Sequence, residues 1–131
     1  MIPQRSASSF TDITQEIRSK YNLIAFDERG TGRSNPFHCL SGAGWDQFLS
    51  YTPDTSTVTG QNQTTSVFQS LAQGCEKTLG KNIAHYSTVD SARDMDVLRN
   101  ILQDKNLNLI GESYGTYLGT IYSSLFPSKV G

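Results

Sequence analysis

The sequence predicts an α/β fold in which helices flank a parallel sheet. Two short apolar runs, residues 22–26 and 107–110, have the length and the bounding turn residues of strands buried on both faces. Segments with helical periodicity alternate with these runs, and such alternation favours a parallel sheet. The 131 residues correspond to one compact domain or to part of a larger one.

The first predicted helix ends near residue 20. Its apolar residues recur at helical spacing: Phe10, Ile13 and Ile17. The predicted strand 22–26 follows and leads into residues 27–36. Two glycines and a proline in this segment indicate a structured turn. Its composition alone fits a plain surface loop equally well.

The middle of the chain is predicted to be irregular over residues 37–65. Residues 51–66 are rich in Thr, Ser, Gln and Asn, so they are predicted to form an exposed polar insertion. Asn62-Gln63-Thr64 within it is a glycosylation sequon, which matters only in a secreted protein. Because chance sequons are common, the motif alone assigns no modification. A helix is predicted over 66–79, ending near Gly80.

A stronger helix is predicted to begin at Ser87 or Thr88 and to end around residues 103–105. Its apolar stripe consists of Ala92, Met95, Leu98, Ile101 and Leu102. The second strand, a sharp turn over 111–115 and a final helix over 116–126 complete the pattern, and Pro127 stops the last helix.

The residues Gly111-Glu112-Ser113-Tyr114-Gly115 match the pattern G-x-S-x-G. The motif follows a predicted strand and opens a predicted helix, which is the setting of a nucleophile elbow. There the serine occupies a strained turn, and the glycines on either side avoid collisions. The first amides of the helix, including that of Tyr114, can then stabilise an oxyanion beside Ser113. The alternative is a glycine-rich turn with an inert serine.

These motifs, taken in order, resemble the α/β-hydrolase superfamily. Residues 21–34 look like the family's strand and D-x-R-G-x-G-x-S loop. The match continues through the two cysteines, the helix at 91–99 and the segment 111–119. This ordered set is similar to the tripeptidyl-aminopeptidase-like branch of the prolyl aminopeptidase (S33) serine peptidases. The resemblance covers about residues 21–131, apart from the polar insertion.

The resemblance implies a serine hydrolase that releases short N-terminal peptides through an acyl-enzyme, with a peptide or small acyl substrate. It makes Ser113 the nucleophile and the Tyr114 N–H half of the oxyanion hole. Residues implied to shape the site are Asp27, Arg29, Gly30, Gly111, Glu112 and Gly115. Cys39 and Cys75 match a family pair that forms a disulfide in secreted members, while free buried thiols are equally compatible. No cofactor is implied, because serine acyl transfer needs none.

The sequence does not supply a complete catalytic triad. In α/β-hydrolases the acid and the base follow the nucleophile, and residues 114–131 contain no Asp, Glu or His. His38 and His85 precede Ser113 and are expected to be structural or solvent-facing. Glu112 is expected to pack beside the site, because adjacent side chains at an elbow point apart. The family's early strands and oxyanion loop are not matched either. We therefore expect residues 1–131 to be a partial α/β-hydrolase domain, truncated at both ends.

Composition and charge argue against several classes of partner and site. Eleven basic and 12 acidic residues give a net charge of -1, which offers no electrostatic case for nucleic acid. No apolar run approaches the ~18 residues of a membrane span, and the two cysteines lack metal-ligand spacing. The first residues have no apolar stretch typical of a secretory signal, although relatives are often secreted. Localisation and oligomeric state stay open, as do two alternatives: an inactive fragment or interaction protein, and an esterase-type hydrolase.

Overall fold

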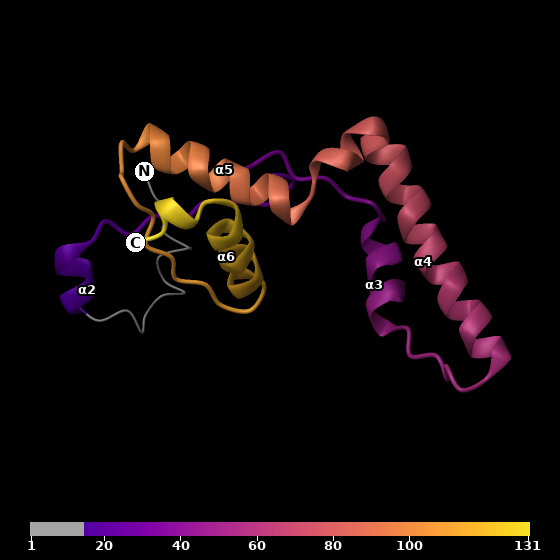
Figure 1. Cartoon of the computed structure of the whole chain (residues 1–131). Helices are drawn as coiled ribbons and strands as arrows, with labels where there is room; N and C mark the ends of the chain where they lie inside the picture. Colours follow the sequence, from indigo (N-terminus) through magenta and orange to yellow (C-terminus); the bar gives the residue numbers. More distant parts are fainter. Residues whose placement is uncertain (1–14) are drawn as a thin grey trace.

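The computed structural model describes residues 15–131, so Phe10 and Ile13 of the first predicted helix lie outside the described residues. The elements in chain order are α2 (Gln15–Lys20), α3 (Gly42–Ser50), α4 (Val58–Leu79), the 3-10 helix η1 (Gly80–His85), α5 (Thr88–Ile101), α6 (Tyr114–Leu125) and the 3-10 helix η2 (Pro127–Lys129). In Figure 1, α5 and α6 lie together near the C-terminus, while α3 and α4 form a hairpin that projects away from them.

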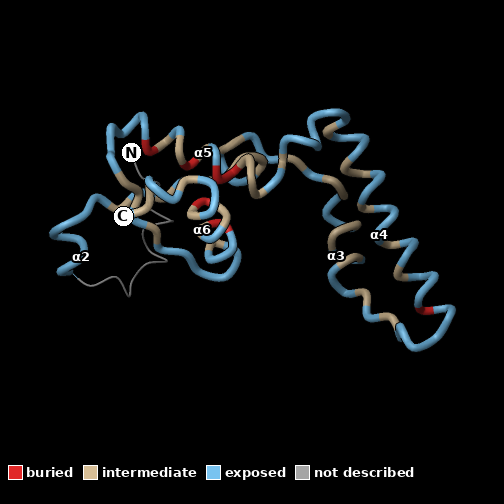
Figure 2. Tube along the Cα trace, viewed as in Figure 1, coloured by how far each residue is buried: buried red, intermediate tan, exposed pale blue. Residues whose placement is uncertain are grey.

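The apolar core lies between α5 and α6. Its buried members are Ala92, Met95, Leu118 and Tyr122, as the red segments of Figure 2 show for these two helices. The predicted stripe on α5 is therefore confirmed at its N-terminal end. It is wrong at the other end, where Ile101 is 71% exposed. In that last turn Arg99 is buried, whereas Ile101 faces solvent on the other side of the helix.

The predicted parallel sheet is not formed within residues 15–131. Residues 22–28 and 108–112 belong to no helix and to no paired strand. The one parallel pairing described is an isolated bridge between Leu107 and Val130, in which the Leu107 N–H donates to the Lys129 carbonyl at 2.7 Å. A strand requires a neighbour for its backbone N–H and C=O groups. Because these two segments find none in the described chain, the predicted strands remain unpaired.

The hairpin of α3 and α4 corrects the prediction for the middle of the chain. Residues 37–65 were expected to be irregular, yet α3 forms there and α4 begins at Val58. Local caps explain both starts: the Ser41 side chain accepts from the Gly44 N–H, and the Thr57 side chain accepts from the Gly60 N–H, each at 3.1 Å. Residues 51–66 are nevertheless mostly exposed, which agrees with their polar composition.

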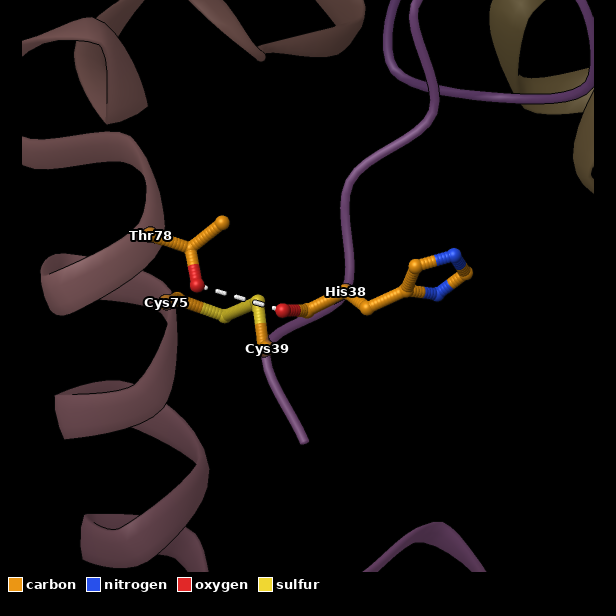
Figure 3. Close-up of a disulfide and its surroundings, with 4 residues drawn as sticks. All are labelled: His38, Cys39, Cys75 and Thr78. Atoms are coloured by element: carbon orange, nitrogen blue, oxygen red, sulfur yellow. Dashed lines mark hydrogen bonds between the residues drawn. A yellow bond between two sulfur atoms is a disulfide. The ribbon is translucent and has the colours of Figure 1, made fainter. Parts of the chain in front are cut away.

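A disulfide between Cys39 and Cys75 closes the base of this hairpin. A Cβ atom at Gly74 would overlap the carbonyl oxygen of Cys39, so only glycine permits this approach of α4. Thr78 adds a hydrogen bond from its hydroxyl to the His38 carbonyl at 3.1 Å (Figure 3). The disulfide therefore joins α4 to the segment that follows the 27–36 loop, across a separation of 36 residues.

Candidate active site

Ser113 lies at the junction between the extended residues before it and the start of α6. Its backbone has φ 50° and ψ -120°, a region that residues with a Cβ atom seldom adopt. The residue is exposed, and its hydroxyl makes no hydrogen bond to any residue from 15 to 131. The local backbone thus presents this serine side chain freely, ahead of the first turn of a helix.

One backbone amide beside Ser113 remains available. The Gly115 N–H donates to the Glu112 carbonyl at 2.8 Å, and the Thr116 N–H donates to the Ser113 carbonyl at 3.0 Å. The Tyr114 N–H has no acceptor in the described part of the chain. Because it is the first amide of α6, it also lies at the positive end of the helix dipole. A free amide in this place has the properties of an oxyanion donor.

The two glycines of the motif have different surroundings. A Cβ atom at Gly111 would overlap the carbonyl of Gly115, so the turn closes only with glycine at position 111. A Cβ atom at Gly115 would meet nothing within 4 Å. The steric reason expected from the sequence therefore holds at Gly111, whereas the described chain supplies none at Gly115.

The Tyr114 side chain connects the elbow to the start of α5. Its hydroxyl lies 2.9 Å from the hydroxyl of Thr88, and its ring centroid lies 6.2 Å from that of Tyr117. Thr88 was considered only as a helix cap, but the capping side chain is Ser87, which accepts from the Asp90 N–H at 3.1 Å. Sequence reasoning missed this tyrosine–threonine contact because no local pattern marks a pair 26 residues apart.

The loop after residue 26 is a structured turn organised by Asp27. The Asp27 carboxylate accepts from the Arg33 N–H at 2.9 Å, and the Asp27 carbonyl accepts from the Ser34 hydroxyl at 2.7 Å. A Cβ atom at Gly32 would overlap this carboxyl group, and one at Gly30 (φ 81°) would overlap the ring of Phe37. The glycines are therefore required both by the backbone conformation and by close packing.

Arg29 fastens this loop to α5. Its Nε donates to Asp94 Oδ2 at 2.7 Å, its Nη2 donates to Asp94 Oδ1 at 2.6 Å, and its Nη1 donates to the His85 carbonyl at 2.6 Å. The hydrogen bonds to Asp94 are the main reason why the pKa of Arg29 is raised above its usual value. Arg29 is thus a fully charged clamp whose donors are directed at the protein itself.

Neither histidine interacts with Ser113 in the described chain. The contacts of His38 and His85 that the structure shows are made by their backbone carbonyls, and both residues are exposed. In Figure 3 the imidazole of His38 points away from the disulfide. Glu112 is exposed as well, and its carbonyl forms the turn with Gly115. Within residues 15–131, no group of three His, Cys, Asp or Glu side chains could hold a metal ion.

A groove of about 630 Å³ runs along α6 next to the elbow. Its walls include Phe26 and Ile110 from the two extended segments, and Gly111 and Gly115 from the motif. Phe26 is 40% exposed and Ile110 is 57% exposed, although both were predicted to be buried on a sheet.

None of the helices in the described chain is long and apolar enough to cross a membrane.

Comparison with known proteins assigns the family. The model of the alpha/beta hydrolase fold matches residues 3–131, and the chain belongs to this family. It is 36% identical over 110 residues to a tripeptidyl aminopeptidase of Streptomyces lividans, covering 84% of this chain and 20% of that protein. It is 31% identical over 123 residues to the serine protease Hip1 of Mycobacterium tuberculosis (strain H37Rv), covering 92% and 24%.

A third relative carries a different name. The carboxylesterase B of Mycobacterium tuberculosis (strain CDC 1551) is 35% identical over 86 residues, which cover 64% of this chain and 16% of that protein. The chain thus spans about a fifth to a quarter of the two peptidases and less of the esterase. The resemblance to the tripeptidyl-aminopeptidase branch is confirmed by these relatives.

Proposed function

We propose that this chain is the nucleophile-bearing part of a serine peptidase that releases short peptides from the N-terminus of its substrates. The observation that carries the proposal is the strained, exposed Ser113, next to the unpaired amide of Tyr114. The names of the tripeptidyl aminopeptidase and serine protease relatives support a peptide substrate. In this proposal the strained backbone of Ser113 positions its hydroxyl away from α6, where it can attack a substrate.

In this mechanism the Ser113 oxygen attacks the carbonyl carbon of the scissile peptide bond. A general base removes the hydroxyl proton, and the Tyr114 N–H donates to the oxyanion that forms. Collapse of this intermediate breaks the C–N bond, and the amine leaves with the proton that the base returns. Water then hydrolyses the acyl-enzyme and frees Ser113. The base and its orienting acid are not among the residues that the structure brings to Ser113.

We also propose that the two unpaired segments are strands of one parallel sheet in a larger domain, of which residues 1–131 form part. Exposed Phe26 and Ile110 line a groove beside the elbow, and a sheet would bury both side chains. The parallel bridge between Leu107 and Val130 involves only the second segment and supports a parallel arrangement there. Packing against further strands would also give Gly115 the close neighbour that the described chain does not supply.

The loop residues receive supporting roles in this proposal. Asp27 and Gly30 shape a turn at the end of one extended segment, and Arg29 secures that turn to α5. Tyr114 connects α5 to the elbow through Thr88. Glu112 supplies the carbonyl that closes the first turn. These residues would therefore position the wall of the site and take no part in the proton transfers.

An esterase is the second candidate, favoured by the likeness to carboxylesterase B. Peptidases and esterases share the elbow geometry, since both stabilise a tetrahedral oxyanion. Two chromogenic substrates distinguish a peptidase from an esterase: a tripeptide anilide with a free amino terminus, and a short-chain acyl ester. Each releases a coloured leaving group when it is cleaved. A peptidase of this kind cleaves the anilide and loses that activity when the amino terminus is acetylated. Preference for the ester would favour the second candidate.

The test of the nucleophile uses the full-length protein and a fluorophosphonate probe. We expect stoichiometric labelling that disappears in Ser113→Ala. Ser124→Ala is the matched control, because Ser124 is an exposed serine on the same helix whose hydroxyl donates to the Thr120 carbonyl at 2.9 Å. A folded full-length protein that takes up no probe, or labelling that survives in Ser113→Ala, would contradict the proposal and favour a non-enzymatic interaction protein.

A further inference from the structure

Asn62 lies on the outer face of α4, away from the elbow. The residues Asn62-Gln63-Thr64 form the only N-x-Ser/Thr sequon of the sequence. Asn62 is exposed, and its side-chain amide makes no hydrogen bond to any residue between 15 and 131. The acceptor nitrogen is therefore free and accessible in the folded chain. We propose that Asn62 carries an N-linked glycan.

The helical register separates Asn62 from the packed side of α4. The side toward α3 and the disulfide contains residues that are buried or half-buried: Gly60, Thr64, Val67, Leu71, Gly74 and Cys75. The opposite side is exposed and mostly polar: besides Val58 it contains Asn62, Ser66, Gln69, Gln73 and Glu76. Figure 2 shows this alternation of tan and pale blue along α4. A bulky, hydrated substituent at Asn62 points into solvent and disturbs no packed contact.

The disulfide is an independent observation for the same proposal. Cys39 and Cys75 are the only cysteines of the sequence, and they are joined in the structure. Disulfides form in oxidising compartments such as the endoplasmic reticulum, which is also where N-linked glycans are attached in eukaryotic cells. The sequon and the disulfide lie on the same helix, so both modifications would occur on one segment during secretion.

The position of the hairpin leaves room for a glycan. In Figure 1 α4 projects away from α5 and α6, and its N-terminal part, where Asn62 lies, is far from the elbow. Val58, four residues earlier, is on the same outer side of the helix and is 72% exposed. The first sugars would therefore lie next to an apolar side chain that has no cover in the described chain, and would raise the solubility of this surface.

The modification is a group transfer with a defined donor, an oligosaccharide linked to a lipid diphosphate. The side-chain amide nitrogen of Asn62 forms a bond to the anomeric carbon of the first sugar. The bond from that carbon to the phosphate oxygen breaks, and the lipid diphosphate leaves. The amide nitrogen loses one proton in the exchange. No change in oxidation state occurs, so the donor is the only co-reactant required.

The experiment uses the protein purified from the organism that produces it. We expect peptide N-glycosidase to lower its mass and to convert Asn62 to Asp, as read by peptide mapping in heavy-oxygen water. Recovery of the peptide with unmodified Asn62 as the dominant species would overturn the proposal.

Matched variants expressed in the same organism separate the sequon from folding effects. Thr64→Ser keeps a hydroxyl and is expected to keep the glycan. Thr64→Ala and Asn62→Gln are expected to lack the glycan, so each should be lighter than the wild type by the mass that peptide N-glycosidase removes. Loss of the mass shift in Thr64→Ser, or its retention in Thr64→Ala, would contradict assignment to Asn62. None of these outcomes depends on whether Ser113 is a nucleophile, so this proposal and the proposed function fail separately.

Discussion

Arg29 holds Asp94 with two hydrogen bonds across 65 residues of sequence, from Nε to Oδ2 at 2.7 Å and from Nη2 to Oδ1 at 2.6 Å. This fork-like geometry suits a guanidinium and a carboxylate, and a lysine ammonium cannot reproduce it. The pair connects the Asp27 loop to α5, and a third donor of Arg29 reaches the His85 carbonyl. Its effect on the site is indirect, because it fixes the loop and contacts neither Ser113 nor Tyr114.

Replacing Arg29 by Lys is expected to lower the free energy of unfolding by about 1 kcal/mol, because one point charge replaces three directed donors. The side chains of Arg29 and Asp94 are partly solvated, 31% and 39% exposed, so a larger loss is not expected. Urea unfolding of the purified protein measures the change. Lys20 and Glu16 form a more exposed ion pair, so Glu16→Gln is the control and should change stability less. Equal decreases in the free energy of unfolding of the two variants would contradict a stabilising role of the Arg29–Asp94 pair.

Gly111→Ala is expected to lower the free energy of unfolding by about 2 kcal/mol or more, because its Cβ atom would overlap the Gly115 carbonyl. The same substitution should remove fluorophosphonate labelling, since the elbow can no longer close. Gly42→Ala is the matched control: a Cβ atom there meets nothing within 4 Å at the start of α3. Thermal unfolding of both variants tests the difference, and a neutral Gly111→Ala would show that the turn adapts.

Ser113→Gly is expected to raise the free energy of unfolding by about 1 kcal/mol, because glycine adopts φ 50° without a Cβ penalty. Ser113→Ala keeps the Cβ atom and should change stability little, although both variants lose labelling. The comparison separates backbone strain from loss of the hydroxyl. If the glycine variant were no more stable than the alanine variant, the strain at the elbow would not be stored in this dihedral angle.

Removal of the disulfide by Cys39→Ser with Cys75→Ser is expected to cost about 3 to 4 kcal/mol, as loop closure over 36 residues suggests. The α3–α4 hairpin should lose amide protection first, because the hydrogen bond from Thr78 to His38 is the other cross-link that the structure shows at its base. Hydrogen exchange measures this by region. The buried contacts of α5 and α6 should remain protected, and uniform loss across the chain would contradict a local role.

Stability is expected to decrease as the pH falls below about 4, because paired carboxylates become protonated. The Arg99 hydrogen bond, more than any other contact, lowers the pKa of Asp96 in the folded protein. Its contribution is therefore complete above the unfolded pKa and disappears as the pH falls through the folded one. Urea unfolding of the wild type and Asp96→Asn over this range should give stabilities that converge at low pH. A difference independent of pH would exclude Asp96 as the cause.

The helices around the elbow could be predicted because their signals are local. Ser87 was one of two candidate caps for α5, and α6 begins at Tyr114, two residues earlier than its periodicity suggested. The start of α4 was not predicted, because its polar residues resemble those of a loop. Its N-terminal turn depends on a single capping hydroxyl at Thr57. Composition averages over a segment, whereas one cap determines where a helix begins.

The sequence around Ser113 is sufficient to specify the turn, because few residue types fit its positions. In the G-x-S-x-G motif, Ser113 adopts a strained backbone conformation, and position 111 has no room for a Cβ atom. Both requirements lie within five consecutive residues. The contacts of Arg29 with Asp94, Thr88 with Tyr114 and Cys39 with Cys75 join segments between 26 and 65 residues apart. The two cysteines can form a disulfide only with each other, but the polar pairs depend on how the helices pack, because many polar residues of the chain have the same local chemistry. Three-dimensional packing selected which of them meet.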